Sequence, residues 1–579
     1  MSATTRSRAI TFVVASSVAV AIAVAALAAG CGGAGGESGG SSDEGPAPPV
    51  CDGEVEVPDE QLRALLLAVL TDPEATDTDS DTSGAPPGLT GEDLARITGL
   101  QGAGRGIVDL KGLECAKNMV SLGLADNKIT GLGPLAPLAG LRELELSKNP
   151  IADLAPLANL TALEKLVLAG SGVADLEVVT GMTGLRHLDV AGGEVTDIGP
   201  LAGLANLESL VLTNNKVADL GPLAGLGALF ALELDGNAIT DIGPLAGLTR
   251  LEYLDLDDNK ITSLEPLAGL ERLRDLEAAR NQVTATAGLA GKPDLVELSL
   301  GTNQIAALTG LSGLGSVTTI DLDANALVDL DGVEKLTHLR TLNARANHIE
   351  DIGAVATLVE LRRLDLRDNP GLLDLGPVKS LKMLDYLGAG GSQLAQDLSP
   401  LTGLPLLRAV ELADGGTADY GPLTTLPALR YLGLAGAKVD QADLADLAQI
   451  VALTTLTIRD TAITDLEPLA PLVALENLDA SGTGITSVAT VLGWPFLKSL
   501  AVSDTAVADL SGFDLLEDLS DLDFDGTKVA DLQPLVDNVR FRNGDSVNVA
   551  GAAVDTADCA DILALRERDA VVTTDLACE

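Results

Sequence analysis

Leucine-type residues return at a constant interval through most of the chain. Similar segments open every 22 residues at twelve consecutive positions, which are Met119, Leu141, Leu163, Leu185, Leu207, Leu229, Leu251, Leu273, Leu295, Val317, Leu339 and Leu361. The interval then varies at Leu381, Leu407, Leu429 and Leu453, and it returns to 22 residues at Leu475, Leu497 and Leu519. A fixed interval of this length predicts a stack of about 19 similar structural units over residues 119–545.

Each unit repeats one pattern of apolar and polar positions. Residues 141–162, LRELELSKNPIADLAPLANLTA, begin with leucines that alternate with polar residues. This alternation predicts a short strand whose leucines point inward and whose other residues point outward. Farther along the unit, Asp153 and Pro156 predict a capped 3₁₀ or helical turn on the opposite, convex side. A single unit cannot bury its leucines alone, so neighbouring units must share one core.

A column of asparagines follows the predicted strands. It consists of Asn127, Asn149, Asn215, Asn237, Asn259, Asn281, Asn303, Asn325, Asn347 and Asn369. Because an amide both donates and accepts hydrogen bonds, a buried column can satisfy backbone groups where the chain leaves the sheet. Ser171 and Gly193 interrupt the column, and Thr461, Thr483, Thr505 and Thr527 replace it with a predicted hydroxyl ladder.

The segments on either side of the repeats predict two caps. Within residues 51–118, the sequence VPDEQLRALLLAVL places Leu62, Leu65 and Leu66 at helical spacing. Thr90 stands three residues before Asp93, which is typical of a helix start. Residues 546–579 contain ADILALRERDAVVTTDLAC, which predicts a small helix and a strand that cover the last leucines.

The N-terminus has the order of parts of a secretory signal. Arg6 and Arg8 precede an apolar run that ends near Ala28, and residues 1–30 are therefore expected to be a targeting segment. The residues up to Cys31 resemble a bacterial lipobox, which implies lipidation of Cys31, although Ala28 stands where that motif usually has leucine. Cleavage after Ala28 by an ordinary signal peptidase and an uncleaved anchor are the alternatives. Residues 31–50 are rich in Gly, Ser and Pro and predict a flexible tether.

The remaining cysteines stand in pairs at the two ends of the repeats. We predict disulfides Cys51–Cys115 and Cys559–Cys578, each of which would lock one cap. The alternative is four free, buried thiols. Their spacing has no zinc signature, so no metal site is expected there.

Composition restricts the classes of partner. The chain has 37 basic and 84 acidic residues, a formal charge of −47, and only 2% aromatic residues. Such a surface repels phosphate backbones, which excludes nucleic acid as a natural partner. The core must be aliphatic, because there are too few aromatic side chains to build it.

Acidic residues gather at the outward positions of neighbouring strands. Together with one tyrosine they form a predicted strip on the concave face, whose members are Glu233, Asp235, Tyr253, Asp255, Asp257, Asp258, Asp275, Glu277, Glu297, Asp321 and Asp323. Carboxylates about 4.8 Å apart on adjacent strands repel each other unless counterions or a partner neutralise them. The strip therefore predicts docking of a basic protein or weak Ca²⁺ binding, and the alternative is general surface acidity. Arg363 and Arg367, with Asp365 and Asp368, form a mixed patch at one edge.

Two other features carry no catalytic or metal prediction. Asp77–Gly84 resembles a calcium loop, but Thr82 replaces its required glycine, which favours a solvated loop. The three histidines, His187, His338 and His348, lie in different units, and none shares a motif with a nucleophile. We therefore expect no enzyme activity and no cofactor.

The 22-residue unit, the I-x-D-L-x-P-L-A-x-L segment and the helical cap resemble the bacterial leucine-rich repeat proteins typified by internalins. The likeness covers residues 55 to about 545. It implies an α/β solenoid, a horseshoe with a parallel concave β-sheet, 3₁₀ or irregular convex segments, and caps at both ends. Internalins are surface proteins that bind host or envelope proteins through the concave face. The paucity of aromatic residues on the concave face is a departure from that family.

The sequence thus predicts a lipid-anchored protein of the cell envelope. We expect an outer-membrane lipoprotein whose concave face binds protein partners in adhesion or recognition. The side of the membrane that it faces stays open. A periplasmic scaffold or spacer is the alternative, and a peptide or cation sensor is another.

Overall fold

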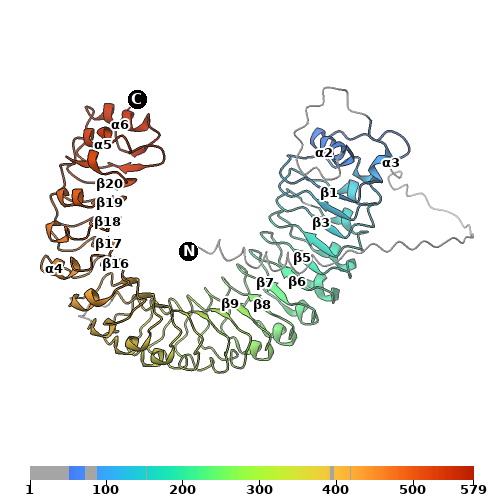
Figure 1. The fold of residues 1–579 in the computed structure, drawn as a ribbon. Helices are drawn as coiled ribbons and strands as arrows, with labels where there is room; N and C mark the ends of the chain where they lie inside the picture. The colour runs from blue at the N-terminus through green and yellow to red at the C-terminus, as the bar shows by residue number, and fades with distance from the viewer. Residues whose placement is uncertain (1–50, 72–87, 152, 392–396, 417–418, 579) are drawn as a thin grey trace, which may run out of the picture. The chain divides into compact units, whose positions relative to one another are not determined.

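A computed structural model describes residues 51–71, 88–151, 153–391, 397–416 and 419–578 (Figure 1). The predicted signal, Cys31, the tether and the loop Asp77–Gly84 lie outside these residues. The described chain has 22 strands of three residues each, β1 Gly99–Gln101, β2 Ser121–Gly123, β3 Glu143–Glu145, β4 Lys165–Val167, β5 His187–Asp189, β6 Ser209–Val211, β7 Ala231–Glu233, β8 Tyr253–Asp255, β9 Asp275–Glu277, β10 Glu297–Ser299, β11 Thr319–Asp321, β12 Thr341–Asn343, β13 Arg363–Asp365, β14 Tyr386–Gly388, β15 Ala409–Glu411, β16 Tyr431–Gly433, β17 Thr455–Thr457, β18 Asn477–Asp479, β19 Ser499–Ala501, β20 Asp521–Asp523, β21 Ser546–Asn548 and β22 Val571–Thr573.

These strands form one parallel sheet in which each strand pairs with its neighbours in the chain. The register is constant, so the central leucines of successive strands stand side by side, as Leu232 does with Leu254. Figure 1 shows the labelled strands following one another along the concave side of the repeats. The α/β solenoid expected from the period is therefore confirmed.

Short 3₁₀ turns occupy the convex side of most units. They are η2 Leu113–Cys115, η3 Gly133–Leu135, η4 Ala155–Leu157, η5 Glu177–Gly181, η6 Gly199–Gly203, η7 Gly221–Leu223, η8 Gly243–Gly247, η9 Glu265–Gly269, η10 Gly353–Thr357, η11 Gly376–Ser380, η12 Ser399–Leu401, η13 Gly421–Thr425, η14 Glu467–Leu469, η15 Ala489–Gly493 and η16 Phe513–Leu515. The aspartates before them cap the turns from outside, because the Asp241 carboxylate accepts the Gly243 N–H at 2.7 Å and Asp197 accepts that of Gly199 at 2.8 Å.

The asparagine column joins each turn to the one before it. Asn149 is 1% exposed, and its Nδ2 donates to the carbonyl of Leu146 in its own turn at 3.0 Å and to that of Leu124 in the previous turn at 2.8 Å. Its Oδ1 accepts the Ile129 N–H at 3.0 Å. Three backbone groups that would otherwise be unpaired are satisfied by one side chain.

The threonines near the C-terminus act differently from a ladder. Each hydroxyl donates to the carbonyl three residues earlier in its own turn, as Thr483 does to Ala480 and Thr505 to Val502, both at 2.6 Å. A hydroxyl has one proton to donate and is shorter than an amide. In the described hydrogen bonds it therefore closes its own turn without reaching the preceding one.

One apolar cluster runs through all units, from Val57 in the N-terminal cap to Val572 in the last strand. The leucines of the strands and of the 3₁₀ turns are nearly all inaccessible to solvent. This continuous core is what makes the units interdependent.

The N-terminal cap contains α2 Glu60–Thr71 and α3 Gly91–Leu94. The leucines predicted at helical spacing are the buried residues of α2. Thr90 and Asp93 form a reciprocal capping box at the start of α3. The predicted disulfide Cys51–Cys115 ties the cap to the first turns.

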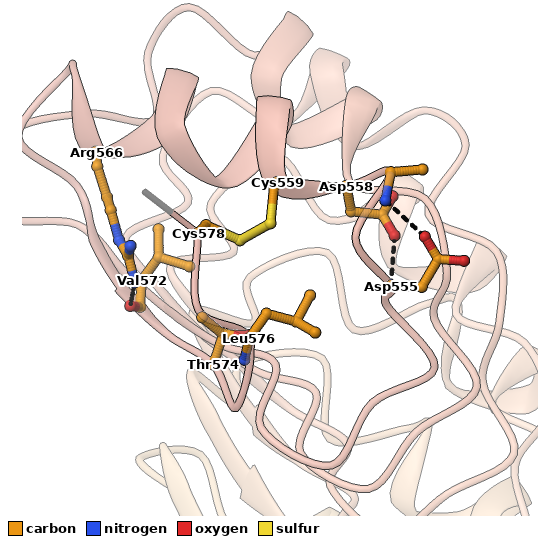
Figure 2. The surroundings of a disulfide bond; sticks show 9 residues. Asp555, Asp558, Cys559, Arg566, Val572, Thr574, Leu576 and Cys578 are labelled. Carbon is orange, nitrogen blue, oxygen red and sulfur yellow. Dashed lines mark hydrogen bonds between the residues drawn. A yellow bond between two sulfur atoms is a disulfide. The ribbon is translucent and has the colours of Figure 1, made fainter.

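The C-terminal cap contains α5 Gln533–Asp537 and α6 Cys559–Arg566, followed by β22. Figure 2 shows the predicted disulfide Cys559–Cys578 between the start of α6 and the chain end. Arg566 donates from Nη2 to the carbonyl of Val572 at 3.1 Å, which joins the other end of α6 to β22. A further short helix, α4 Leu444–Leu447, replaces a 3₁₀ turn within the repeats. None of the helices in the described residues is long and apolar enough to cross a membrane.

The sheet extends into both predicted caps, since β1 precedes residue 119 and β21 and β22 follow residue 545. The prediction that Leu381 opens a turn is wrong. Arg363 pairs with Tyr386, which makes Leu384 the equivalent of Leu361. One extra residue in this turn lengthens the interval to 23 residues. Leu381 does not open the turn; it occupies the position of the leucine that follows the 3₁₀ turn.

The asparagine column gives a stability prediction. Replacing Asn347, which is 2% exposed and bonded to two turns, by alanine should lower the free energy of unfolding by about 2–3 kcal/mol, because buried backbone groups lose their partners. The exposed Asn206 donates to a backbone carbonyl too, and Asn206→Ala should cost less than about 0.5 kcal/mol. Denaturation midpoints of the two variants measure the difference. Equal midpoints would contradict a special role for the column.

Candidate functional site

The sheet register arranges the predicted acidic residues in rows on the concave face. Glu233, Asp255 and Glu277 are direct partners across β7, β8 and β9. Tyr253, Asp275 and Glu297 form a second row across β8, β9 and β10. Ser299 stands between Glu277 and Asp321 in the first row, so the strip has a dense part on β7–β9 and a sparser part on β11.

Three carboxylates of the dense part converge. Oxygen atoms of Asp255, Asp257 and Glu277 all lie within 4.8 Å of one another. Backbone N–H groups orient two of them, since Asp257 N donates to Asp255 Oδ1 at 2.9 Å and Ala279 N donates to Asp257 Oδ1 at 2.6 Å. The short strands thus hold like charges together that would separate on a flexible chain.

Burial makes this part of the strip electrostatically unfavourable. It raises the pKa of Asp255 to about 8 and that of Asp257 to about 7, and neighbouring carboxylates add to both shifts. The pKa of Glu233 is raised to about 7, first by burial and then by the charge of Asp189. Perturbed carboxyl groups in one place are typical of functional sites, because neutralisation by a partner relieves their repulsion.

One arginine of the chain already neutralises one side of the cluster. Arg280 donates from Nη2 to Asp257 at 3.1 Å and from Nε to Asp258 at 2.6 Å. Asp235, in the turn before, keeps one buried oxygen, Oδ1, without a hydrogen-bond partner in the described structure. Burial also raises the pKa of Asp235. The strip therefore keeps a buried acceptor that Arg280 does not satisfy by a hydrogen bond.

The other members of the predicted strip stand apart from this cluster. Glu297 is exposed. Asp321 accepts from Asn343 Nδ2 at 2.8 Å, and burial together with the charge of Asp321 raises the pKa of Asp323.

The predicted mixed patch on β13 is tied together internally. Arg367 bonds to Asp365 at 2.9 and 2.7 Å, and Asp368 accepts from Arg345 at 2.6 Å. Arg363 stacks over the ring of Tyr386 on β14, with 3.7 Å from Cζ to the ring centroid.

Sequence reasoning missed several residues of the concave face. Arg280 lies three residues after a strand, outside the strand positions from which the rows were predicted. Tyr386 was missed because the interval between leucines changes before its strand. Tyr431 on β16 was also missed, although Leu429 was placed correctly and puts Tyr431 at an outward strand position, where its hydroxyl donates to Glu411 at 2.6 Å. Alignment of the leucines by strand instead of by fixed interval would have found Tyr386.

The side chains of this face limit the chemistry that it can perform. The converging carboxylates are ligands that Ca²⁺ accepts, so the weak-cation interpretation applies to Asp255, Asp257 and Glu277. The histidines stay apart: His187 lies on β5 with a buried, unpaired Nδ1, and His338 contacts Glu360 at 3.2 Å. Within the described residues, neither histidine is hydrogen-bonded to a nucleophilic side chain, which is the geometry that covalent catalysis requires.

Comparisons with known proteins agree with this fold. A family model described as Leucine Rich repeats (2 copies) matches residues 229–269, which include β7 and β8. A search of curated protein sequences finds no match.

Three solved structures are similar to the chain. An internalin, InlF of Listeria monocytogenes, is 25% identical and the match covers 73% of this chain and 96% of that one, with a TM-score of 0.42. The functional domain of InlJ from the same organism, which includes a cysteine ladder, is 22% identical over 74% of this chain and 80% of that one, with a TM-score of 0.50. The plant peptide hormone receptor RGFR1 in complex with RGF2 is 16% identical over 83% and 94%, with a TM-score of 0.53. The last two likenesses show the fold.

The raised pKa values give a pH prediction. Asp255 has a higher pKa in the folded chain than its ordinary value of 3.8, so folding is favoured at low pH and loses stability as pH rises from about 4 to about 8. Asp255→Asn should raise the free energy of unfolding by about 1–2 kcal/mol at pH 8.5 and change it little at pH 5. Melting temperatures at the two pH values measure this, with the exposed Asp294→Asn as control. A gain from Asp255→Asn of the same size at both pH values would contradict it.

Proposed function

Because this chain is a leucine-rich repeat protein similar to the bacterial internalins, we propose that it binds a basic protein partner through the acidic strip on its concave face. Leucine-rich repeats are protein-binding modules, and the choice of face and partner charge is specific to this chain. The convergence of the buried Asp257 with the half-buried Asp255 and Glu277 carries the proposal. The rigid sheet already bears the cost of holding these charges together, and a cationic partner would relieve their repulsion.

The geometry of the strip supports recognition of lysine or arginine side chains. Asp235 Oδ1 is a buried acceptor without a partner in the described structure, and Tyr253 lies one row away from Asp255. A cationic head could bind the carboxylates while its aliphatic stem packs on the tyrosine ring. The similar fold of the plant receptor in complex with RGF2 supports the use of such a solenoid for holding a polypeptide.

We also propose that the protein acts in the cell envelope as a lipoprotein anchored through Cys31, outside the cytoplasm. The two disulfides support an oxidising compartment. The basic, apolar and cysteine-containing parts of residues 1–31 support export and lipidation. In this proposal the protein has no catalytic role, and adhesion or recognition follows from the binding face alone.

Poly-L-lysine tests the acidic strip directly. The full chain should bind it with an affinity that falls as salt rises. The triple variant Asp255→Asn, Asp257→Asn, Glu277→Gln should bind about tenfold more weakly. The matched control neutralises three exposed acids outside the strip, Glu271→Gln, Asp294→Asn and Asp518→Asn, and should bind almost as tightly as the unaltered chain.

Equal losses in the two triple variants would show that general surface acidity binds the polymer, which favours the spacer interpretation. The same variants separate a protein site from a cation site. If 1 mM Ca²⁺ raises the melting temperature of the unaltered chain alone and abolishes poly-L-lysine binding, the strip is a calcium site and the proposal of a basic protein partner fails.

Protease treatment of intact cells tests the envelope proposal. Peptides from residues 119–545 should be released from unbroken cells if the repeats face outward, whereas Cys31→Ala should move the protein from the membrane fraction to the soluble fraction. Mass spectrometry and fractionation measure the two effects. An unchanged membrane fraction for Cys31→Ala would exclude lipid anchoring, and protection until the outer membrane is opened would place the repeats in the periplasm.

A further inference from the structure

Basic residues are distributed unevenly along the solenoid. Residues 340–430 contain nine Lys and Arg against eleven Asp and Glu, whereas residues 229–323, which carry the acidic strip, contain six against fifteen. The stretch around β12–β16 is therefore nearly neutral in a chain whose formal charge is −47. Its arginines stand out against that background.

Four of these arginines, Arg340, Arg362, Arg408 and Arg430, share one position in the unit, the residue immediately before the strand. Backbone hydrogen bonds place them in one column along the entry edge of the sheet: Arg362 N donates to the Arg340 carbonyl at 2.9 Å, and Arg430 N donates to that of Arg408 at 2.8 Å. The half-buried Asp385 stands between Arg362 and Arg408. The four arginines are exposed.

The same column is self-neutralised in the N-terminal units. There, Arg142 pairs with Glu164 and Arg186 with Glu208, each with the next unit along. At β12–β16 this pairing is largely absent. Arg340 lies 3.9 Å from Glu360, and within the described part of the chain Arg362 and Arg408 form no ion pair. Their guanidinium groups remain available to a carboxylate.

The concave face beside this column carries two of the chain's four tyrosines. Tyr386 and Tyr431 are half-buried on β14 and β16, and the small residue Ala409 lies between them on β15. Arg363 is exposed and stacks on the Tyr386 ring, which fixes its planar group. Met383 and Leu406, beside the column, are 37% and 39% exposed.

We propose that Arg362, Arg363, Arg408, Arg430, Tyr386 and Tyr431, here called the arginine–tyrosine patch, form a second docking surface for an acidic protein segment that carries aromatic side chains. The inference rests on the proposed protein-binding function but uses a different surface, with the opposite charge preference. Arginine and tyrosine are the residues on which protein interfaces most depend. Charge complementarity selects the occupant: the guanidinium groups of Arg362 and Arg408, which form no ion pair in the described chain, select carboxylates, and the tyrosines with the apolar edge select rings. The guanidinium of Arg430 already donates to the Leu429 carbonyl at 2.9 Å and keeps further N–H donors.

An acidic segment fits these observations better than a membrane. A lipid surface would have to approach a chain of formal charge −47, including the carboxylates of Asp385 and Glu411 within the same stretch. Asp385 stands in the column between Arg362 and Arg408, and Glu411 accepts from the Tyr431 hydroxyl, so a bound segment would place its carboxylates at the arginines on either side of Asp385.

A random copolymer of glutamate and tyrosine tests the patch in the full chain. It should bind more tightly than poly-L-glutamate, and Arg362→Gln with Arg408→Gln should weaken its binding about tenfold. The matched control, Arg142→Gln with Arg186→Gln, removes two arginines from the same column where they are paired, and should have little effect. Tyr386→Ala should abolish the preference for the copolymer over poly-L-glutamate. Unchanged melting temperatures show that the variants are folded.

The outcomes separate this proposal from the acidic strip. Loss of copolymer binding in the Arg362/Arg408 variant with poly-L-lysine binding intact supports the patch even if the strip proposal fails. Equal losses in the two arginine pairs would overturn it, as would no binding of the copolymer by the unaltered chain. Binding to phosphatidylglycerol vesicles that depends on Arg362 and Arg408, without binding to the copolymer, would overturn it in favour of a membrane surface.

Discussion

The structure depends on satisfying the backbone groups that each turn leaves unpaired when the chain exits the sheet. These groups lie beside an aliphatic core in which water has no place, and in the turns of the asparagine column one side chain satisfies them in its own turn and in the one before. Leucine burial supplies the bulk of the stability and disfavours a slip of one residue, which would turn the leucines outward. The asparagine bonds add to this, because each requires the neighbouring turn in one register. Fixed register is the property from which the surface chemistry follows.

A fixed register turns sequence into rows on the concave face. Side chains in a row are held about 4.8 Å apart whatever their charge. This explains how Asp255, Asp257 and Glu277 converge although their repulsion raises the pKa of Asp255 to about 8. The two docking surfaces that we propose, an acidic strip on β7–β11 and an arginine–tyrosine patch on β13–β16, would lie on one sheet for the same reason. The distance between the strip and the patch is set by the number of turns that lie between them, and not by the conformation of loops.

Much of this could be predicted from the sequence because the signal repeats. The interval between leucines predicts the solenoid, and the outward positions predict which acids share a row. The interval fails where a residue is inserted, so Leu381 was placed in register instead of Leu384 and the tyrosine of β14 was missed. Arg280 could not be predicted as a partner of Asp257, because a loop residue reaches back across a turn. The threonine turns were expected to form a ladder, but each threonine hydroxyl has one proton and donates it to a carbonyl of its own turn.

The central claim is that this protein meets its partner on the concave face of the sheet. A photo-cross-linking residue, benzoylphenylalanine, placed at Tyr253 on β8 or at the exposed Ala246 in the convex turn η8, tests this within a single unit. In the cells that produce the protein, irradiation should yield a discrete protein adduct from position 253 and none from position 246. Adducts of equal yield from both positions, or from position 246 alone, would contradict the claim.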